Sequence, residues 1–186
     1  MKILLIRHGL TAGNLEKRYI GRTDEPLCQE GINELRQCSF PRCDVLVSSP
    51  MQRCMQTAEM LFPAQPVHIC AAFRECDFGD FEGKNYAELN GEPQYQAWID
   101  SGGTMPFPNG ESPVSFRARC CDGFKQMTDT FADAESIAFV VHGGTIMAIL
   151  SQFSVPHRDY YDWMTANAHG WLCDYDGQTI TVQEKL

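Results

Sequence analysis

The sequence predicts an α/β protein with three layers, in which a mostly parallel central sheet lies between helices on both faces. Two observations predict this fold class. Short, continuously apolar segments alternate with helical segments, as they do when parallel strands are buried on both sides. In addition, a turn-rich stretch with several aromatic residues precedes the last of these apolar segments. This stretch predicts a small helical cap inserted before the last core strand.

Each element follows from a local pattern. The expected core strands are the apolar segments 2–6, 44–50, 67–73 and 137–142. The expected helices are 31–38, 51–62, 115–131 and 145–153. The helix over 51–62 contains strong helix formers and ends before Pro63. Residues 9–31 read mainly as a loop because of their glycines, and weaker strands are expected near 171–175 and 179–183.

The cap is expected over residues 79–114, with short helical pieces near 85–89 and 93–100 and the turn-rich segment GGTMPFPNGESP after them. Together with the sheet it forms one predicted domain, residues 1–186. The aromatic residues of the region are Phe78, Phe81, Tyr86, Tyr95, Trp98 and Phe107. They are expected either to stack on an aromatic substrate or to attach the cap to the sheet.

Composition narrows the possible functions. The chain has 186 residues, a formal net charge of −9 and no run rich in Lys and Arg, so nucleic acid and membrane surfaces are not expected partners. No apolar run is long enough to cross a bilayer, and the N-terminus lacks the pattern of a signal peptide. The nine cysteines include no Cys-x-x-Cys pair, which disfavours a zinc site. We therefore expect a cytoplasmic protein with reduced thiols, either a monomer or a homodimer.

Polar residues follow three of the predicted strands at one edge of the sheet, where ligands bind in such folds. The first strand is followed by Arg7 and His8, and the second by Ser48, Ser49 and Pro50 with Arg53 in the next helix. The last core strand ends at His142, before Gly143 and Gly144. Guanidinium groups, imidazoles and free backbone N–H groups at one edge predict a site for a phosphate dianion.

Four motifs in this order resemble those of the histidine phosphatase superfamily, also called phosphoglycerate mutase-like. They are RHG at 7–9, PMQRCMQTA with Arg53, ECDFGDFEG with Glu75, and VVHGG with His142. The resemblance extends from Ile3 to about Leu150. It implies that His8 is the nucleophile that becomes phosphohistidine, that Arg7, Arg53 and His142 form the phosphate pocket, and that Glu75 is the acid and base. It also implies substrate contacts by Asn14, Gly21 and Gly143, and no metal or organic cofactor.

The chemistry of these residue types fits this implication. A neutral imidazole can attack phosphorus and leave again when water arrives, and the neighbouring Arg7 disfavours protonation of His8. A carboxyl such as Glu75 can protonate the leaving alkoxide and later deprotonate water. Asp77, Asp80 and Glu82 lie close to Glu75 in the sequence and are expected to be solvated loop charges.

Among members of the superfamily, the chain is most similar in pattern to small bacterial phosphatases of the α-ribazole phosphatase type. The segment YIGRTDEPLCQEG also resembles cofactor-dependent phosphoglycerate mutases. Only 67 positions separate Glu75 from His142, which leaves room for a small cap and an open pocket. Because access of water favours hydrolysis, we expect a phosphomonoesterase that acts on a small-molecule phosphate such as α-ribazole 5′-phosphate. A mutase and a catalytically inactive phosphate-binding module remain as alternatives.

Overall fold

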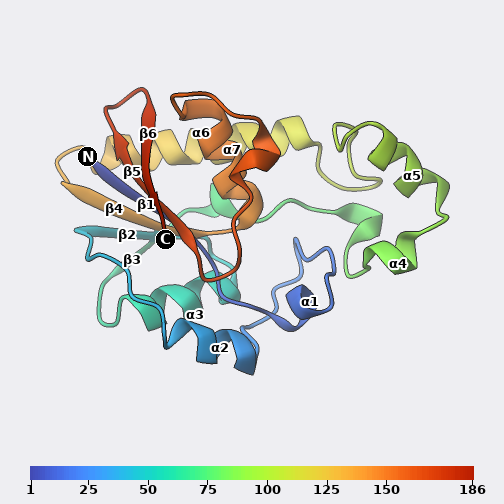
Figure 1. Ribbon diagram of the computed structural model, residues 1–186, viewed down its shortest axis with the longest axis horizontal. Helices are drawn as coiled ribbons and strands as arrows, with labels where there is room; N and C mark the ends of the chain where they lie inside the picture. The colour runs from blue at the N-terminus through green and yellow to red at the C-terminus, as the bar shows by residue number, and fades with distance from the viewer.

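The computed structural model, which describes residues 1–186, contains one six-stranded sheet with the order β3-β2-β4-β1-β5-β6 (Figure 1). The strands are β1 (Lys2–Arg7), β2 (Val45–Ser48), β3 (Val67–Ile69), β4 (Ser136–Val141), β5 (Gly170–Tyr175) and β6 (Ile180–Lys185). The first four are mutually parallel, whereas β5 and β6 run antiparallel to their neighbours. This confirms the mostly parallel sheet and the two weaker strands near the C-terminus.

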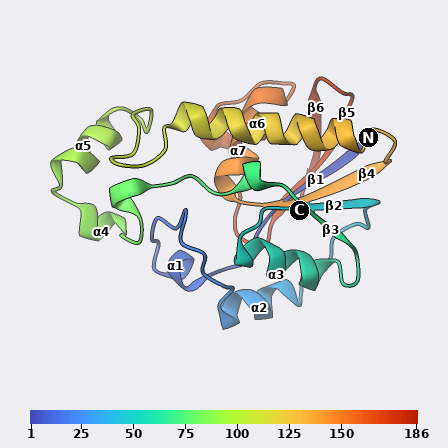
Figure 2. The same cartoon turned by 180° about the vertical axis from the view of Figure 1, so that it is seen from behind.

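Helices cover both faces of the sheet, as Figures 1 and 2 show. One layer contains α2 (Gln29–Leu35) and α3 (Gln52–Leu61), and the other contains α6 (Pro113–Thr130) and α7 (Gly143–Phe153). Alternation along β1 explains the two layers. Leu4 and Ile6 belong to the core cluster on the α3 side, whereas Ile3 and Leu5 belong to the larger cluster that includes Phe124 of α6. No helix is both long enough and apolar enough to span a membrane.

The cap projects from the sheet edge at which the four parallel strands end (Figures 1 and 2). It contains α4 (Tyr86–Leu89) and α5 (Pro93–Asp100) and lies near the short helix α1 (Ala12–Leu15). Phe81 and Phe107 are buried at its centre, with Phe78, Tyr95 and Trp98 packed against them. The same aromatic cluster therefore builds the cap and, as described below, contributes to a pocket wall.

Two predicted elements near the site differ in extent from those observed, and an element that was not predicted follows α7. The strand expected over 67–73 ends at Ile69, because the chain then forms a 3-10 turn at Ala71–Phe73 that buries Phe73 completely in the core. The helix expected from residue 145 begins at Gly143, so that both glycines lie in its first turn and His142 immediately precedes it. A 3-10 turn at Tyr160–Trp163 was not predicted.

Candidate active site

His8 lies where β1 ends, with only 3% of its surface exposed. Its Nδ1 is 2.7 Å from the carbonyl oxygen of Gly9. A carbonyl can only accept, so Nδ1 carries the proton and Nε2 carries the lone pair. The bond at Nδ1 is the one hydrogen bond that the ring makes within the protein, and Nε2 makes none. The ring is therefore held in the tautomer that a nucleophilic imidazole requires.

Electrostatics keep His8 uncharged. Burial lowers its pKa well below the usual value of 6.5, and the positive charges of Arg53 and Arg7 lower it further. The hydrogen bond to Gly9 acts in the opposite direction but is the smallest of these causes. At neutral pH His8 is therefore a neutral imidazole.

His142 follows β4 and directly precedes α7, which places it beside His8. The centroids of the two rings are 5.2 Å apart, with an edge-to-face arrangement. Its Nε2 is 2.8 Å from the hydroxyl of Ser49, which follows β2. Burial lowers the pKa of His142 well below 6.5, and the charge of Arg53 adds to this effect. The carboxyl ends of β1, β2 and β4 thus deliver the three groups to one place, as the sequence predicted.

Two arginines lie in the same region without a carboxylate partner. Arg53 is 1% exposed, and its terminal nitrogens donate to the carbonyls of Thr23 and Gly21 at 2.8 and 3.0 Å. Arg7 donates to the carbonyl of Thr165 at 2.7 Å. The Nε of each arginine is buried and has no hydrogen-bond partner. Arg53 is a buried cation, Arg7 is partly buried, and buried donors without partners are costly, so this arrangement is suited to an anion.

The first turn of α7 adds to this anion site. A side-chain carbon at Gly143 would lie only 3.3 Å from Nε of Arg7. The helix N-terminus and the guanidinium are therefore in close contact, which a glycine permits without displacing either. Because the free N–H groups of an 11-residue helix begin here, the N-terminus favours the same negative charge as the two arginines.

Glu75 is the carboxyl that reaches this region. Its Oε1 accepts a hydrogen bond from the backbone N–H of Cys76 at 2.9 Å. Burial raises its pKa above the usual value of 4.5, although this hydrogen bond and the charges of Arg53 and Arg7 partly counteract the shift. A carboxyl with a raised pKa is suited to donate a proton.

The three neighbouring carboxylates are occupied elsewhere. Asp77 accepts from the N–H of Gly79, Asp80 accepts from the side chain of Asn109, and Glu82 accepts from two backbone N–H groups. None of the three lines the pocket described next. The geometry thus favours Glu75 over its neighbours as the acid.

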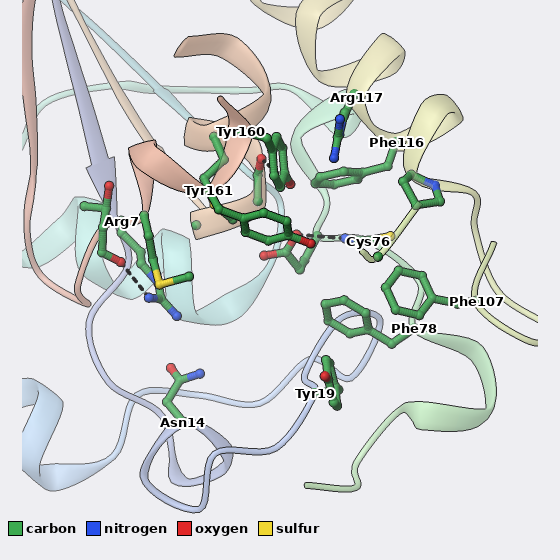
Figure 3. Close-up of a pocket in the computed structure, with 18 of the residues that line it drawn as sticks. Arg7, Asn14, Tyr19, Cys76, Phe78, Phe107, Phe116, Arg117, Tyr160 and Tyr161 are labelled. Atoms are coloured by element: carbon green, nitrogen blue, oxygen red, sulfur yellow. Dashed lines mark hydrogen bonds between the residues drawn. The ribbon is translucent and has the colours of Figure 1, made fainter. Parts of the chain in front are cut away.

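A pocket of about 610 Å³ opens over these groups (Figure 3). Arg7, Asn14, Glu75 and Gly143 line its polar end. Seven aromatic side chains make up much of the remaining wall, which also contains the cations Lys17, Arg18 and Arg117 and the methionines Met147 and Met164. The aromatic residues are Tyr19, Phe78, Trp98, Phe107, Phe116, Tyr160 and Tyr161. His8, Arg53 and His142 are buried and are not among the residues that line the pocket. The cavity therefore combines an anion-binding end with an aromatic body.

Of two further residues that the resemblance implied as substrate contacts, one lines the pocket and the other does not. Asn14 lines the pocket, and its Oδ1 accepts from the side chain of Asn167 at 3.0 Å, which leaves its amide donors free. Gly21 does not line the pocket, and its N–H already donates to Glu82 at 2.8 Å. A side-chain carbon at Gly21 would lie 1.9 Å from the carbonyl oxygen of Cys76. Packing alone thus explains glycine at this position.

Sequence reasoning missed the segment after α7, which contributes Tyr160, Tyr161, Thr165 and Asn167 to the pocket. Asn167 also donates to the carbonyl of His8 at 3.0 Å. The direction of β5 could have revealed this segment. Because β5 runs antiparallel to β1, the residues before β5 must lie at the carboxyl end of β1. The sequence predicted β5 but not its direction.

Fold and site together define a phosphoryl-transfer enzyme built around a histidine. Comparison with known proteins agrees. The family model described as "Histidine phosphatase superfamily (branch 1)" matches residues 3–185, and the chain belongs to this family of phosphatases and mutases. It is an enzyme of the phosphatase class.

Three relatives illustrate the similarity. The adenosylcobalamin/α-ribazole phosphatase of Salmonella typhimurium is 28% identical over 163 residues, which cover 82% of this chain and 79% of that protein. The 2,3-bisphosphoglycerate-dependent phosphoglycerate mutase 2 of Gloeobacter violaceus is 30% identical over 163 residues, covering 81% and 74%. The crystal structure of the α-ribazole phosphatase from Shigella flexneri superimposes with a TM-score of 0.85 at 24% identity, covering 98% of this chain and 95% of that one. The last similarity is one of fold.

Proposed function

We propose that this protein is a phosphomonoesterase that hydrolyses a small-molecule phosphate through a phosphohistidine at Nε2 of His8. The observation that carries the proposal is a pair of arginines, the buried Arg53 and the partly buried Arg7, each with a buried, unpartnered Nε and no carboxylate partner, around a neutral histidine. A phosphate dianion would supply the missing negative charge and hydrogen-bond acceptors.

In the first step, Nε2 of His8 attacks phosphorus and forms a P–N bond while the P–O bond to the alcohol breaks. Glu75 gives its proton to the departing oxygen, which would otherwise be a poor leaving group. Arg7, Arg53, His142 and the N-terminus of α7 stabilise the charge on the remaining phosphoryl oxygens. No metal ion takes part in this proposed step.

In the second step, a water molecule replaces the alcohol. Glu75, now a carboxylate, removes a proton from the water, and the water oxygen attacks phosphorus. The P–N bond breaks, and its electron pair returns to Nε2 of His8. Inorganic phosphate then leaves, and the enzyme regains its starting protonation state.

The aromatic body of the pocket supports a substrate with a planar apolar group. Phe78, Phe107 and Phe116 lie on the opposite side of the cavity from Arg7 and Asn14 (Figure 3). A substrate that places its phosphate against the arginines would therefore place its remainder among aromatic rings, which favour stacking. α-Ribazole 5′-phosphate, whose base is a dimethylbenzimidazole, fits this description, and relatives bearing the α-ribazole phosphatase name add support.

Phosphoglycerate mutase activity is the second candidate, and the relative from Gloeobacter violaceus favours it. The small cap argues for hydrolysis instead, because it leaves the pocket accessible to water. An inactive phosphate-binding module is disfavoured, since His8, Glu75 and both arginines are present and arranged for reaction. We further propose that the enzyme acts in the cytoplasm on small molecules alone, where its nine free cysteines stay reduced.

The experiment is phosphate release from a panel of phosphomonoesters: α-ribazole 5′-phosphate, 3-phosphoglycerate, sugar phosphates and nucleotides. The variant His8→Ala tests the nucleophile, and His157→Ala, which changes an exposed histidine, is the matched control. A marked preference for α-ribazole 5′-phosphate that disappears in His8→Ala supports the proposal. Isomerisation of 3-phosphoglycerate without hydrolysis would replace it with the mutase.

A further inference from the structure

Arg119, on α6, uses all five of its N–H donors. Nε and Nη2 bind the two carboxylate oxygens of Glu111, each at 2.8 Å. Nη1 donates to the carbonyls of Ala72 and Arg74 at 2.7 and 2.6 Å, and Nη2 also donates to the carbonyl of Glu75 at 3.1 Å. A guanidinium saturated in this way holds its partners in a defined geometry.

The three carbonyls belong to the segment that carries the proposed acid. This segment leaves β3 through the 3-10 turn at Ala71–Phe73 and has no strand pairing of its own at Glu75. The Glu75 carboxyl in turn accepts from the N–H of Cys76. The direction of the carboxyl therefore depends on the backbone of residues 75 and 76, and Arg119 binds that backbone directly.

Glu111 connects the same arrangement to the cap. Its N–H donates to the carbonyl of Asp77 at 2.9 Å, and the nearby N–H of Asp80 donates to the carbonyl of Pro108 at 2.8 Å. These bonds join the two chain segments through which the cap leaves and re-enters the domain. The ion pair of Arg119 with Glu111 thus links α6, the base of the cap and the Glu75 segment.

We propose that Arg119, held by Glu111, is a positioning residue that aims the Glu75 carboxyl at the leaving oxygen. The inference rests on the proposed function, in which Glu75 is the acid. Lysine at this position would keep the charge beside Glu111 but offers three donors from a single nitrogen in place of a planar fork. It would leave several of the carbonyls of residues 72–75 without a donor.

The test compares Arg119→Lys with the wild type on two substrates that differ in leaving group. The alkoxide that departs from an alkyl phosphate needs a proton from Glu75, whereas the p-nitrophenolate that departs from p-nitrophenyl phosphate leaves readily without one. The quantity compared is kcat/KM, which reports the first step alone, because hydrolysis of the phosphohistidine is common to both substrates. We expect kcat/KM on the alkyl phosphate to fall about 10- to 100-fold, because general-acid catalysis is worth about 10²- to 10⁴-fold and is only partly lost. On p-nitrophenyl phosphate the loss in kcat/KM should stay within about threefold, since little acid catalysis is at stake there.

A double-mutant cycle separates positioning from a general effect on folding. Glu75→Gln alone should lower kcat/KM on the alkyl phosphate, and adding Arg119→Lys should then cause no further loss, because the acid through which Arg119 acts is already absent. Glu111→Gln should produce a milder form of the Arg119→Lys phenotype, and it serves as the second variant if Arg119→Lys does not fold. Arg36→Lys, at an exposed arginine, is the control.

Equal losses in kcat/KM on both substrates, or a further loss in the Glu75→Gln background, would overturn the inference while leaving the proposed function intact. A wild type that releases no phosphate from either substrate would instead overturn the proposed function, and the inference with it. The two failures are therefore distinguishable in one set of assays.

Discussion

Gly144, in the first turn of α7, lies against the proposed acid. A side-chain carbon there would be 2.6 Å from Oε1 of Glu75 and 2.9 Å from the ring of Phe116, whereas ordinary contacts begin at 3.4 Å. The variant Gly144→Ala must therefore displace the carboxyl by about 0.8 Å, the difference between 3.4 and 2.6 Å. A displacement of about 1 Å can cost a factor of about 10² in rate.

The effect on stability should be much smaller. Crowding costs about 1–3 kcal/mol, but alanine is favoured over glycine in a helix by about 1 kcal/mol. The atom that must move furthest is also the end of a flexible side chain. We therefore expect a loss of about 0–2 kcal/mol in the free energy of unfolding, together with a fall of about 10²-fold in kcat on alkyl phosphates.

The assay measures kcat on an alkyl phosphate and on p-nitrophenyl phosphate, with urea denaturation of the same samples. Gln152→Ala, at an exposed position of the same helix, is the control. If Gly144→Ala kept kcat within about twofold of the wild type on the alkyl phosphate while remaining folded, the placement of Glu75 would not matter and the reasoning would be refuted.

Three further predictions follow from the site. His8→Ala should abolish turnover while the protein still folds, because the ring lies at a strand end. Phosphate release measures the turnover and circular dichroism measures the folding. If the variant kept the activity of the wild type, His8 would be excluded as the nucleophile. Below pH 6.5 both histidines bind a proton in the unfolded chain, whereas His8 and His142 stay neutral in the folded protein because their pKa values are lowered. The free energy of unfolding should therefore fall by up to about 2.7 kcal/mol for each pH unit of acidification. The raised pKa of Glu75 acts in the opposite direction and reduces this slope by up to about 1.4 kcal/mol per pH unit. Urea denaturation between pH 7 and 5 measures this slope, which should flatten in His8→Asn. Chelators should leave kcat unchanged, since arginines balance the phosphate charge; a large loss on treatment with EDTA would refute a metal-free reaction.

The sequence predicted those parts of the site that depend on strand ends. Arg7, His8 and His142 each follow a continuously apolar segment, and parallel strands bring such ends to one edge. The register confirms the reasoning, since Arg7 of β1 pairs with Val141 of β4, the residue before His142. The positions of the apolar segments were enough to predict this proximity, because the prediction requires only that the strands be parallel neighbours.

The remaining parts depend on packing that no local pattern encodes. The length of β3 was overestimated because Phe73 is as apolar as a strand residue, yet it is buried through a turn. The proximity of Gly21 to the carbonyl of Cys76 joins two loops that lie 55 positions apart. Asn167 reaches His8 only because β5 reverses direction. Long-range contacts of this kind arise from the tertiary fold.

Burial of the site explains how the proposed nucleophile and the proposed acid can be ready at the same pH. Ordinary pKa values of 6.5 for His8 and 4.5 for Glu75 would require opposite conditions. At pH 5.5, midway between them, only about 10% of each group, and thus about 1% of molecules, would combine a neutral histidine with a protonated carboxyl. Burial is the largest cause of both shifts, and it lowers the pKa of the histidine while raising that of the carboxyl. One physical effect thus moves both groups toward the protonation states that the first step needs, and the arginines, whose charge opposes the shift of Glu75, reinforce that of His8.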